Sequence, residues 1–280
     1  MNNSNVGDFS QREFPMTQQN FEEIKVVAYS LTGISLSNHK KNMVYGRLAR
    51  RLRRLNVASF NEYCDVIREK NSREHVEFVN AITTNLTSFF REGHHFEFLS
   101  TKLLPRLLAE KRQEKRIRIW SAGCSTGEEP YSIAMTLKNF TGMSTWDVKI
   151  LATDLDSNVV EKARLGEYAT ERVETIPDNC RRFIARNNVE DRVRVKDVIR
   201  DMITFKQLNL LHEWPMKGRF DIIFCRNVVI YFDVETQKKL FERYANLLET
   251  TGNLFIGHSE NLHNITSRFK SLGRTIYELN

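Results

Sequence analysis

The chain has 280 residues, 41% of them hydrophobic, which is enough for a sizeable core in one large or two modest domains. No apolar run approaches the roughly 18 residues that span a membrane, and the polar N-terminus lacks the apolar core of a secretion signal, so neither membrane insertion nor secretion is expected. Four widely separated cysteines fit a reducing cytoplasm and argue against a structural zinc site, while the net charge of +7 indicates an anionic partner.

The N-terminal part of the chain is predicted to be helical. Residues 1–16 are polar and are expected to form a disordered leader, and residues 17–90 are expected to form a helical domain. The first helix repeats apolar side chains at three and four residues, in Phe21, Ile24, Ala28 and Leu31. Further amphipathic segments at 44–55, 60–67 and 76–90 predict a bundle of about four helices.

The second predicted helix is unusually basic. Between residues 24 and 61 the chain has eight basic residues and no acidic one. Arg47, Arg50 and Arg54 share one face of this helix beside its apolar stripe, and Arg51 lies among them. A solvated helix face is the alternative, but such faces normally interleave both signs of charge. We therefore interpret this helix as a docking surface for an acidic partner.

The remainder of the chain alternates predicted strands and helices. Residues 91–116 are expected to be a linker, and a charged stretch at 106–118 separates the helical domain from the first strand. Strands are predicted at 117–120, 148–153, 205–210, 220–225, 254–256 and 275–279, with helices at 130–140, 158–165 and 233–248. This alternation predicts a parallel sheet with helices on both faces, and the final strand, which has no crossover helix before it, is expected to run antiparallel. The period-two pattern at 192–196 predicts a small β-subdomain inserted at about 181–205.

The loop after the first predicted strand is a candidate ligand site. Gly123 and Gly127 bracket it, so that the backbone can approach a ligand closely. The glutamates at 128–129 would repel a pyrophosphate but suit a ligand with hydroxyls and positive charge. The next strand ends at Asp154, where nucleotide-binding α/β folds place the acid that binds ribose hydroxyls. A helix N-cap is the alternative role, and Asp156 can fill it.

A second candidate lies where the strand at 220–225 ends. Arg226 and Asn227 follow this buried strand directly, and Tyr231 comes four residues later. The carboxyl edge of a parallel sheet is where such folds place their sites. The alternatives are a surface salt bridge for Arg226 and a packed core aromatic for Tyr231.

Two other kinds of site are not expected. The histidines at 94–95 and His258 have no cysteine or carboxylate at ligand spacing, so no metal is predicted. Ser259 follows a strand beside His258 but does not lie on a G-x-S-x-G elbow, which argues against nucleophilic hydrolysis.

Together these stretches closely resemble the chemotaxis receptor methyltransferases of the CheR type, which esterify glutamates of bacterial chemoreceptors with S-adenosylmethionine. The matching motifs are Thr84-Asn-Leu-Thr-Ser-Phe-Phe-Arg91, Trp120-Ser-Ala-Gly-Cys-Ser-Thr-Gly-Glu-Glu-Pro-Tyr-Ser132, Thr153-Asp-Leu-Asp156, Asn209-Leu-Leu211, Phe224-Cys-Arg-Asn-Val-Val-Ile-Tyr-Phe-Asp233 and Gly257-His-Ser-Glu-Asn261. The resemblance runs from about Phe21 to the C-terminus.

The resemblance implies an α/β fold: a class I (Rossmann-like) S-adenosylmethionine-dependent methyltransferase domain at 117–280, with the β-subdomain inserted in it and an all-α bundle before it. It implies that the cofactor is contacted by Asn85, Thr87, Arg91, Gly123, Glu129, Asp154, Asn209, Leu210, Arg226 and Asn227. Arg91 and Tyr231 would flank the transferred methyl group as catalytic residues, and S-adenosylhomocysteine would be the product. Arg47, Arg50, Arg51 and Arg54 would grip the cytoplasmic helical domain of the receptor.

One departure from the family concerns the β-subdomain, which in some members binds a tethering peptide at the receptor's C-terminus. Members that bind it carry a glycine-bearing loop after the position of Arg186, whereas residues 187–192 here are shorter and have no glycine, which counts against tether binding. The resemblance otherwise implies a cytoplasmic monomer that binds no nucleic acid.

Three alternatives remain open. An RNA or other protein methyltransferase of the same fold would use the basic helix on phosphates, but interleaved aromatics are lacking. A non-catalytic module could bind the cofactor or a second messenger as a signal. A nicotinamide oxidoreductase is disfavoured because the G-x-G-x-x-G fingerprint is missing.

Overall fold

The computed structural model describes residues 12–186 and 191–280, and it divides into two compact units, Met1–Thr84 and Asn85–Asn280. Most of the expected leader, residues 1–11, and most of the loop at 187–192 lie outside the described residues. Among the helices of the described part, none has the length and apolar character needed to cross a membrane.

The first unit is a helical bundle. Its α-helices are α1 (Gln18–Thr32), α2 (Lys41–Leu55), α3 (Phe60–Arg68) and α4 (Glu74–Ile82), with a short 3-10 turn, η2 (Asn38–Lys40), before α2. Thr17 and Asn20 form a capping box at the start of α1, and Gly33 ends that helix in the left-handed conformation. The helical periodicity is confirmed for most of both apolar stripes: Phe21, Ile24 and Ala28 of α1 are buried, as are Val44, Leu48 and Leu52 of α2. The last position of each predicted stripe is not buried, since Leu31 is partly exposed and Leu55 is exposed.

The fourth helix is shorter than its predicted span of 76–90. It ends at Ile82, and residues 83–88 carry no helix. Threonine, asparagine and serine side chains fill this segment, and they compete with the helical backbone for hydrogen bonds. Arg47 of α2 also donates hydrogen bonds to the carbonyl groups of Ala81, Ile82 and Thr83, which satisfies acceptors that a longer helix would have used.

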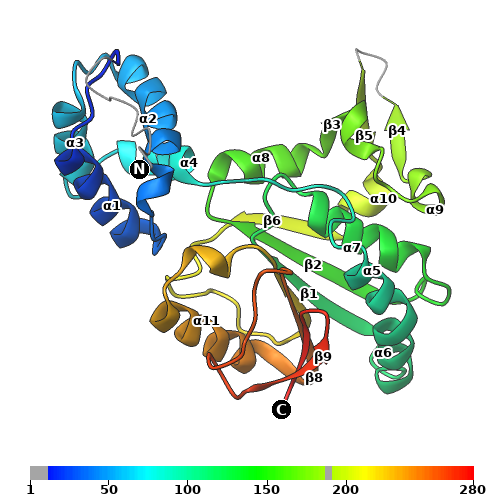
Figure 1. Ribbon diagram of the computed structural model, residues 1–280. Helices are drawn as coiled ribbons and strands as arrows, with labels where there is room; N and C mark the ends of the chain where they lie inside the picture. The colour runs from blue at the N-terminus through cyan, green and yellow to red at the C-terminus, as the bar shows by residue number, and fades with distance from the viewer. Residues whose placement is uncertain (1–11, 187–190) are drawn as a thin grey trace, which may run out of the picture. The chain divides into compact units, whose positions relative to one another are not determined.

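The second unit is built on a seven-stranded sheet in the order β6-β2-β1-β7-β8-β10-β9 (Figure 1). The strands are β1 (Arg116–Ala122), β2 (Asp147–Asp154), β6 (Ile203–Gln207), β7 (Phe220–Cys225), β8 (Leu248–Ile256), β9 (Phe269–Gly273) and β10 (Ile276–Leu279). The strands from β6 to β8 in this order are parallel, whereas β10 is antiparallel to both of its neighbours. The α/β class, the parallel sheet and the antiparallel last strand are thus confirmed.

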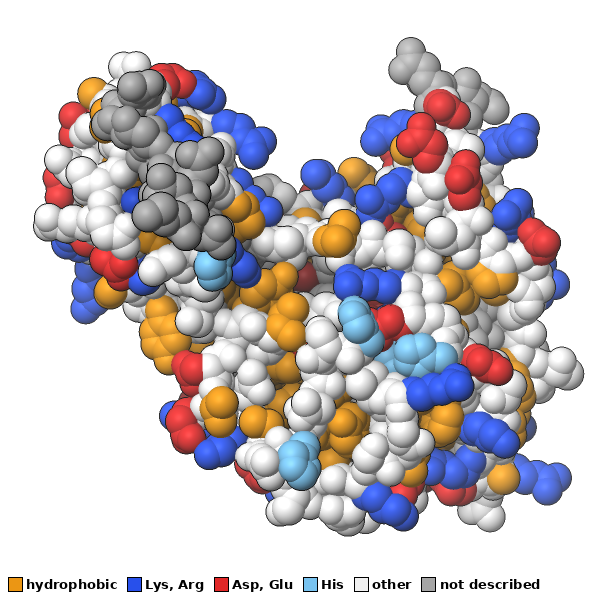
Figure 2. Space-filling view, viewed as in Figure 1, with side chains coloured by type: hydrophobic (Ala, Val, Ile, Leu, Met, Phe, Trp, Pro, Cys, Tyr) orange, Lys and Arg blue, Asp and Glu red, His pale blue; other side chains and the backbone are white. Residues whose placement is uncertain are grey.

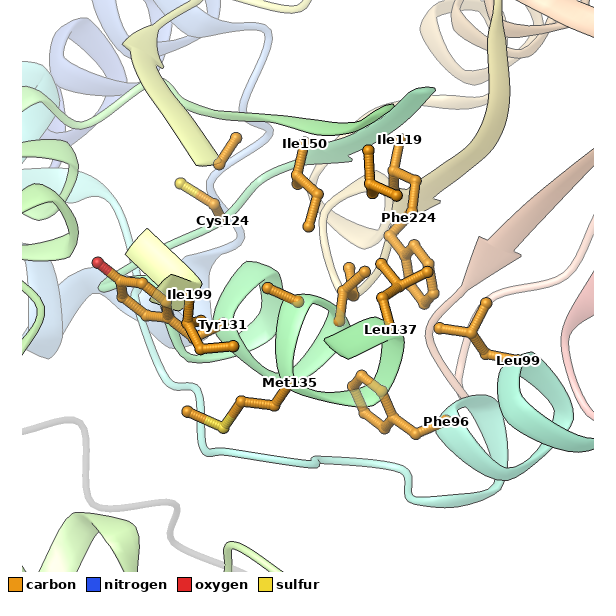
Figure 3. Packing of buried hydrophobic residues seen from close by; sticks show 14 of the residues in the cluster. Phe96, Leu99, Ile119, Cys124, Tyr131, Met135, Leu137, Ile150, Ile199 and Phe224 are labelled. Carbon is orange, nitrogen blue, oxygen red and sulfur yellow. The ribbon is translucent and has the colours of Figure 1, made fainter. Parts of the chain in front are cut away.

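Helices cover both faces of this sheet. One apolar cluster joins β-strands to α7 (Glu128–Asn139), and Figure 3 shows Leu137 of this helix beside Phe224 of the sheet. The other cluster contains Trp120 and side chains of α11 (Val234–Leu247). Successive side chains of a strand point to opposite faces, so Ile119 and Trp120 enter different clusters. Helix α8 (Ser157–Leu165) connects β2 to the inserted subdomain.

The expected linker at 91–116 is largely helical in the structure. It contains α5 (His94–Phe98), a π-helical segment, η3 (Leu99–Leu103), and α6 (Leu104–Glu110). Phe96, Leu99 and Leu104 are buried in the cluster that contains α7. Charged residues between these apolar positions give the segment the composition of a linker, but its buried face is part of the core.

The inserted subdomain differs in extent from the expected 181–205. A three-stranded antiparallel sheet pairs β3 (Glu167–Ala169), β5 (Arg192–Val195) and β4 (Ile184–Arg186), so the insertion starts earlier in the chain. Short helical segments η4 (Thr170–Val173), α9 (Asp178–Arg181) and α10 (Asp197–Arg200) accompany it. Strand β6 belongs to the main sheet, where it pairs with β2.

Candidate functional site

The loop between β1 and α7 has a shape that requires glycine. Gly123 has a φ of +117°, and a Cβ atom added there would lie 2.3 Å from Cγ2 of Val228. Gly127, with a φ of +98°, starts α7. The amide of Gly123 donates to the carbonyl of Thr153 at 2.8 Å, which fastens the loop to the end of β2. Only glycine therefore fits at residue 123, because a larger residue would strain the backbone and clash with Val228.

Asp154 receives backbone donors on both of its oxygens. The amide of Ser125 donates to Oδ2 at 2.8 Å, and the amide of Asp156 donates to Oδ1 at 3.0 Å. Burial raises the pKa of Asp154 to about 6, and these amides oppose that rise. Asp156 caps the N-terminus of α8, as the N-cap alternative predicted, so Asp154 does not fill that role.

Glu129 is the buried acid at the start of α7. Its side chain accepts a hydrogen bond from Ser121 Oγ at 2.7 Å and another from Arg226 Nη1 at 3.1 Å. Burial raises the pKa of Glu129, and Arg226 opposes this rise. Asp154 ends β2, and Glu129 lies in the first turn of α7, the helix that follows the neighbouring parallel strand β1. Two carboxylates therefore lie at the edge where a ligand is expected.

Arg226 connects separate parts of the site through a buried guanidinium. In addition to Glu129, Arg226 forms an ion pair with Glu92 at 3.3 Å and donates to the carbonyl of Arg91. The side chain of Arg226 was expected to contact the cofactor, but its Nη atoms are engaged with these protein groups. Burial would raise the pKa of Glu92, but Arg226 and His258 outweigh burial and lower it.

Glu92 was missed by the sequence analysis. Glu92 directly follows Arg91 and adopts a φ of +58°. No pattern in the sequence predicts this left-handed conformation. Its Oε1 contacts His258 Nδ1 at 2.9 Å, so it also reaches the loop after β8. The one feature of the sequence that could have indicated a functional role for Glu92 is its position next to Arg91, a predicted catalytic residue.

A group of potential metal ligands lies at Glu92, contrary to the expectation that these histidines have no carboxylate partner. One ligand atom from each of Glu92, His94 and His95 lies within 4.8 Å of the others. Both oxygens of Glu92 nevertheless face other groups, Arg226 and His258. We therefore assign Glu92 to the ion-pair network of Arg226.

The segment that follows the helical unit contributes the remaining N-terminal candidates. Nδ2 of Asn85 donates to Oδ2 of Asp156 at 2.7 Å, and its carbonyl accepts from Ser125 Oγ at 3.1 Å. Arg91 is partly exposed and donates from Nη1 to the carbonyl of Leu86 at 2.8 Å. Thr87 is also partly exposed. Asn85 is thus joined to the loop of Gly123 and to the end of β2.

The last candidates follow β6 and β7 at the same edge of the sheet. Oδ1 of Asn209 accepts a hydrogen bond from the amide of Leu211 at 2.9 Å. Leu210 is packed in the cluster that contains α11, with 8% of its surface exposed. Asn227 adopts a left-handed φ of +58° directly after β7. Tyr231 ends the 3-10 turn η5 (Val229–Tyr231) and is partly exposed rather than a buried core aromatic.

The docking candidates on α2 separate into two pairs. Arg51 is 9% exposed, and its guanidinium binds Glu74 at 2.6 Å and Glu77 at 3.0 Å. Arg47 donates to the carbonyls that end α4. Arg50 and Arg54 are exposed and form no ion pair within the described part of the chain. Figure 2 shows Lys and Arg side chains standing out from the surface of the first unit.

Comparison with known proteins matches both units to one family. Residues 85–277 match the CheR methyltransferase, SAM binding domain, and residues 19–83 match the CheR methyltransferase, all-alpha domain.

Curated relatives match nearly the whole chain. Chemotaxis protein methyltransferase 2 of Pseudomonas aeruginosa is 44% identical over 96% of this chain and 96% of its own length. The chemotaxis protein methyltransferase of Escherichia coli is 42% identical over 94% of this chain and 92% of its own. Among solved structures, the glycopeptide N-methyltransferase MtfA matches only weakly, with a TM-score of 0.36 and 13% identity over 62% of this chain and 51% of that one. The sequence relatives and both domain matches establish that the chain belongs to the CheR methyltransferase family.

Proposed function

We propose that this protein transfers a methyl group from S-adenosylmethionine to glutamate side chains of chemoreceptors. The observation that carries the proposal is the site at the carboxyl edge of β1 and β2, in a chain whose relatives are chemotaxis protein methyltransferases. Asp154 and Glu129 present carboxylates there, beside a loop of small residues. A phosphate would be repelled by these acids, whereas ribose hydroxyls and a cationic ligand would be bound.

The residues present fit S-adenosylmethionine. Gly123 keeps the loop in its shape, because its positive φ and the neighbouring Val228 side chain leave no room for a Cβ atom. Asp154 would accept the ribose hydroxyls, and Glu129 would face the positive end of the cofactor. We assign the cofactor contacts to Asn85, Thr87, Arg91, Gly123, Glu129, Asp154, Asn209, Leu210 and Asn227, with Arg226 contributing by holding Glu129 in place.

The chain's own groups would act on the substrate by orientation. The bound cofactor supplies a methyl group on a positively charged sulfur. A substrate glutamate, with a reference pKa of about 4.3, is already ionised at neutral pH, so the chain needs no general base. Arg91 would orient this carboxylate by a charge-assisted hydrogen bond, and Tyr231 would place its ring or hydroxyl near the positive sulfur. Alignment and exclusion of water then account for catalysis.

We assign receptor docking to Arg50 and Arg54, because Arg47 and Arg51 are committed to the bundle. Charge reversal of both exposed arginines is expected to weaken methylation of receptor membranes, most strongly at low salt. Reversal of Lys102 and Lys149, two exposed lysines of the second unit, is the matched control because it changes net charge equally. Equal losses in both double variants would contradict a docking role for α2.

A transfer assay tests the function itself. Radiolabelled S-adenosylmethionine is expected to label receptor-containing membranes in an alkali-labile form, as a carboxyl ester requires. RNA offered instead is expected to remain unlabelled. Labelling of RNA alone would favour the RNA methyltransferase alternative, and cofactor binding without any turnover would favour the non-catalytic module.

We further propose that the protein acts as a cytoplasmic monomer. Its four cysteines are buried and unpaired, which fits a reducing compartment. The β-subdomain is not assigned a tether, since the residues between β4 and β5 that would decide it are mostly outside the described part of the chain.

A further inference from the structure

The loop after β8 contains a buried carboxylate that binds main-chain amides. Glu260 is 4% exposed, and its oxygens accept hydrogen bonds from the amides of Gly257 at 2.5 Å, Asn227 at 2.9 Å and Ile230 at 3.3 Å. The amide of Glu260 in turn donates to the carbonyl of Gly257 at 2.9 Å, which closes the turn. One side chain therefore fastens the loop after β8 to the loop after β7.

The segment that Glu260 holds carries two of the proposed site residues. Asn227 and Tyr231 lie on either side of Ile230, and Asn227 adopts the left-handed conformation that few residues other than glycine occupy. Such a backbone persists only when its surroundings determine it, and here the bond to its amide comes from Glu260.

Gly257 lets the two loops approach closely. A Cβ atom at Gly257 would lie 2.4 Å from Nδ2 of Asn227 and 2.8 Å from its backbone nitrogen. Gly257 and Glu260, which belong to one turn, thus both act on Asn227. The missing Cβ of Gly257 leaves room for the Asn227 side chain, and Glu260 fixes the Asn227 backbone.

We propose that Glu260 is a positioning residue for the cofactor pocket, because its carboxylate fixes the backbone from Asn227 to Ile230 and so places the Asn227 side chain. The proposal rests on the function proposed above. Glutamine at this position has the same shape but one acceptor oxygen in place of two. Its amide group would face a backbone N–H donor, so the turn after β7 would lose at least one bond.

Calorimetry with S-adenosylhomocysteine tests the proposal on the full chain. Glu260→Gln is expected to raise the Kd by about tenfold, equal to about 1.4 kcal/mol. Gly257→Ala displaces Asn227 without changing charge, and it is expected to raise the Kd by a similar factor even if Glu260→Gln folds poorly. Glu74→Gln is the matched control: Glu74 is 5% exposed and ion-paired in the helical unit, so its loss is expected to lower the Tm and leave the Kd within about twofold.

A double-mutant cycle separates positioning from general stability. If Glu260 acts through Asn227, then Glu260→Gln combined with Asn227→Ala is expected to bind no more weakly than the weaker single variant, within about twofold. Multiplied losses would overturn the proposal, as would an unchanged Kd in both Glu260→Gln and Gly257→Ala. The wild-type Kd is measured first: wild-type protein that binds no S-adenosylhomocysteine would reject the proposed function itself.

Discussion

The ionisation of Asp154 is expected to control cofactor affinity near neutral pH. Burial raises the pKa of this carboxyl from 3.8 to about 6. Only the ionised form can accept hydrogen bonds from ribose hydroxyls on all of its lone pairs, because the protonated form uses one oxygen as a donor. Affinity for S-adenosylhomocysteine should therefore fall as the pH drops through about 6.

The size of this effect follows from the pKa. If only the ionised form binds, the measured Kd rises by the inverse of the ionised fraction. With a pKa of about 6, that fraction falls from about nine tenths at pH 7 to about one tenth at pH 5. The Kd is thus expected to rise about tenfold over this range, while Asp154→Asn should bind weakly at both pH values with no comparable slope.

Protonation of Asp154 would not by itself unfold the chain at low pH, so unfolding caused by this group cannot explain the expected loss of affinity. The raised pKa means that the folded chain holds the Asp154 proton more tightly than the unfolded chain does. This contribution to stability is present at low pH and is lost as the pH rises through about 6. Calorimetric titrations at pH 5, 6 and 7, with a parallel Tm measurement, separate the two effects. A Kd that stays constant while the wild-type chain remains folded would refute the reasoning.

Three further substitutions test other parts of the site. Arg91→Ala is expected to lose most methyl transfer and keep S-adenosylhomocysteine affinity within about tenfold, and parallel losses in radiolabel transfer and calorimetry would reject its orienting role. Gly123→Ala should abolish cofactor binding, since its methyl group would overlap Val228, and an unchanged Kd would show that the loop can shift. Arg51→Ala leaves Glu74 buried without its partner and should destabilise the chain by about 3 kcal/mol, seen as a lower denaturation midpoint; a midpoint equal to that of the wild type would contradict a structural role.

The sequence predicts the main sheet well because its signals are local. Every side chain of β7 is buried, and apart from Asp221 the strand is an apolar run. The residues that follow such strands reach the carboxyl edge of the sheet by topology alone. The positions of Asp154 and Asn227 at this edge could be predicted from the sequence. Their contacts could not be predicted in this way, because the partners Ser125 and Glu260 are distant in sequence.

The errors arise where composition and burial disagree. The segment at 91–116 is rich in charge, yet Phe96 and Leu99 make it part of the core. The predicted helix at 76–90 ends at Ile82, because polar side chains and the contact from Arg47 replace the helical bonds beyond it. Periodicity alone does not report such tertiary contacts.

The arginines of α2 show that the sequence also fails to distinguish exposed charges from charges used inside the fold. Its guanidinium stays charged at any ordinary pH, so a buried arginine must be neutralised by the protein itself. On α2, Arg51 is neutralised by Glu74 from another helix, and Arg47 binds carbonyls, although the sequence presents all four arginines as one basic surface. Only Arg50 and Arg54 remain exposed among these four. Receptor binding through α2 should therefore depend more on Arg50 and Arg54 than on Arg51, because Glu74 and Glu77 neutralise the charge of Arg51.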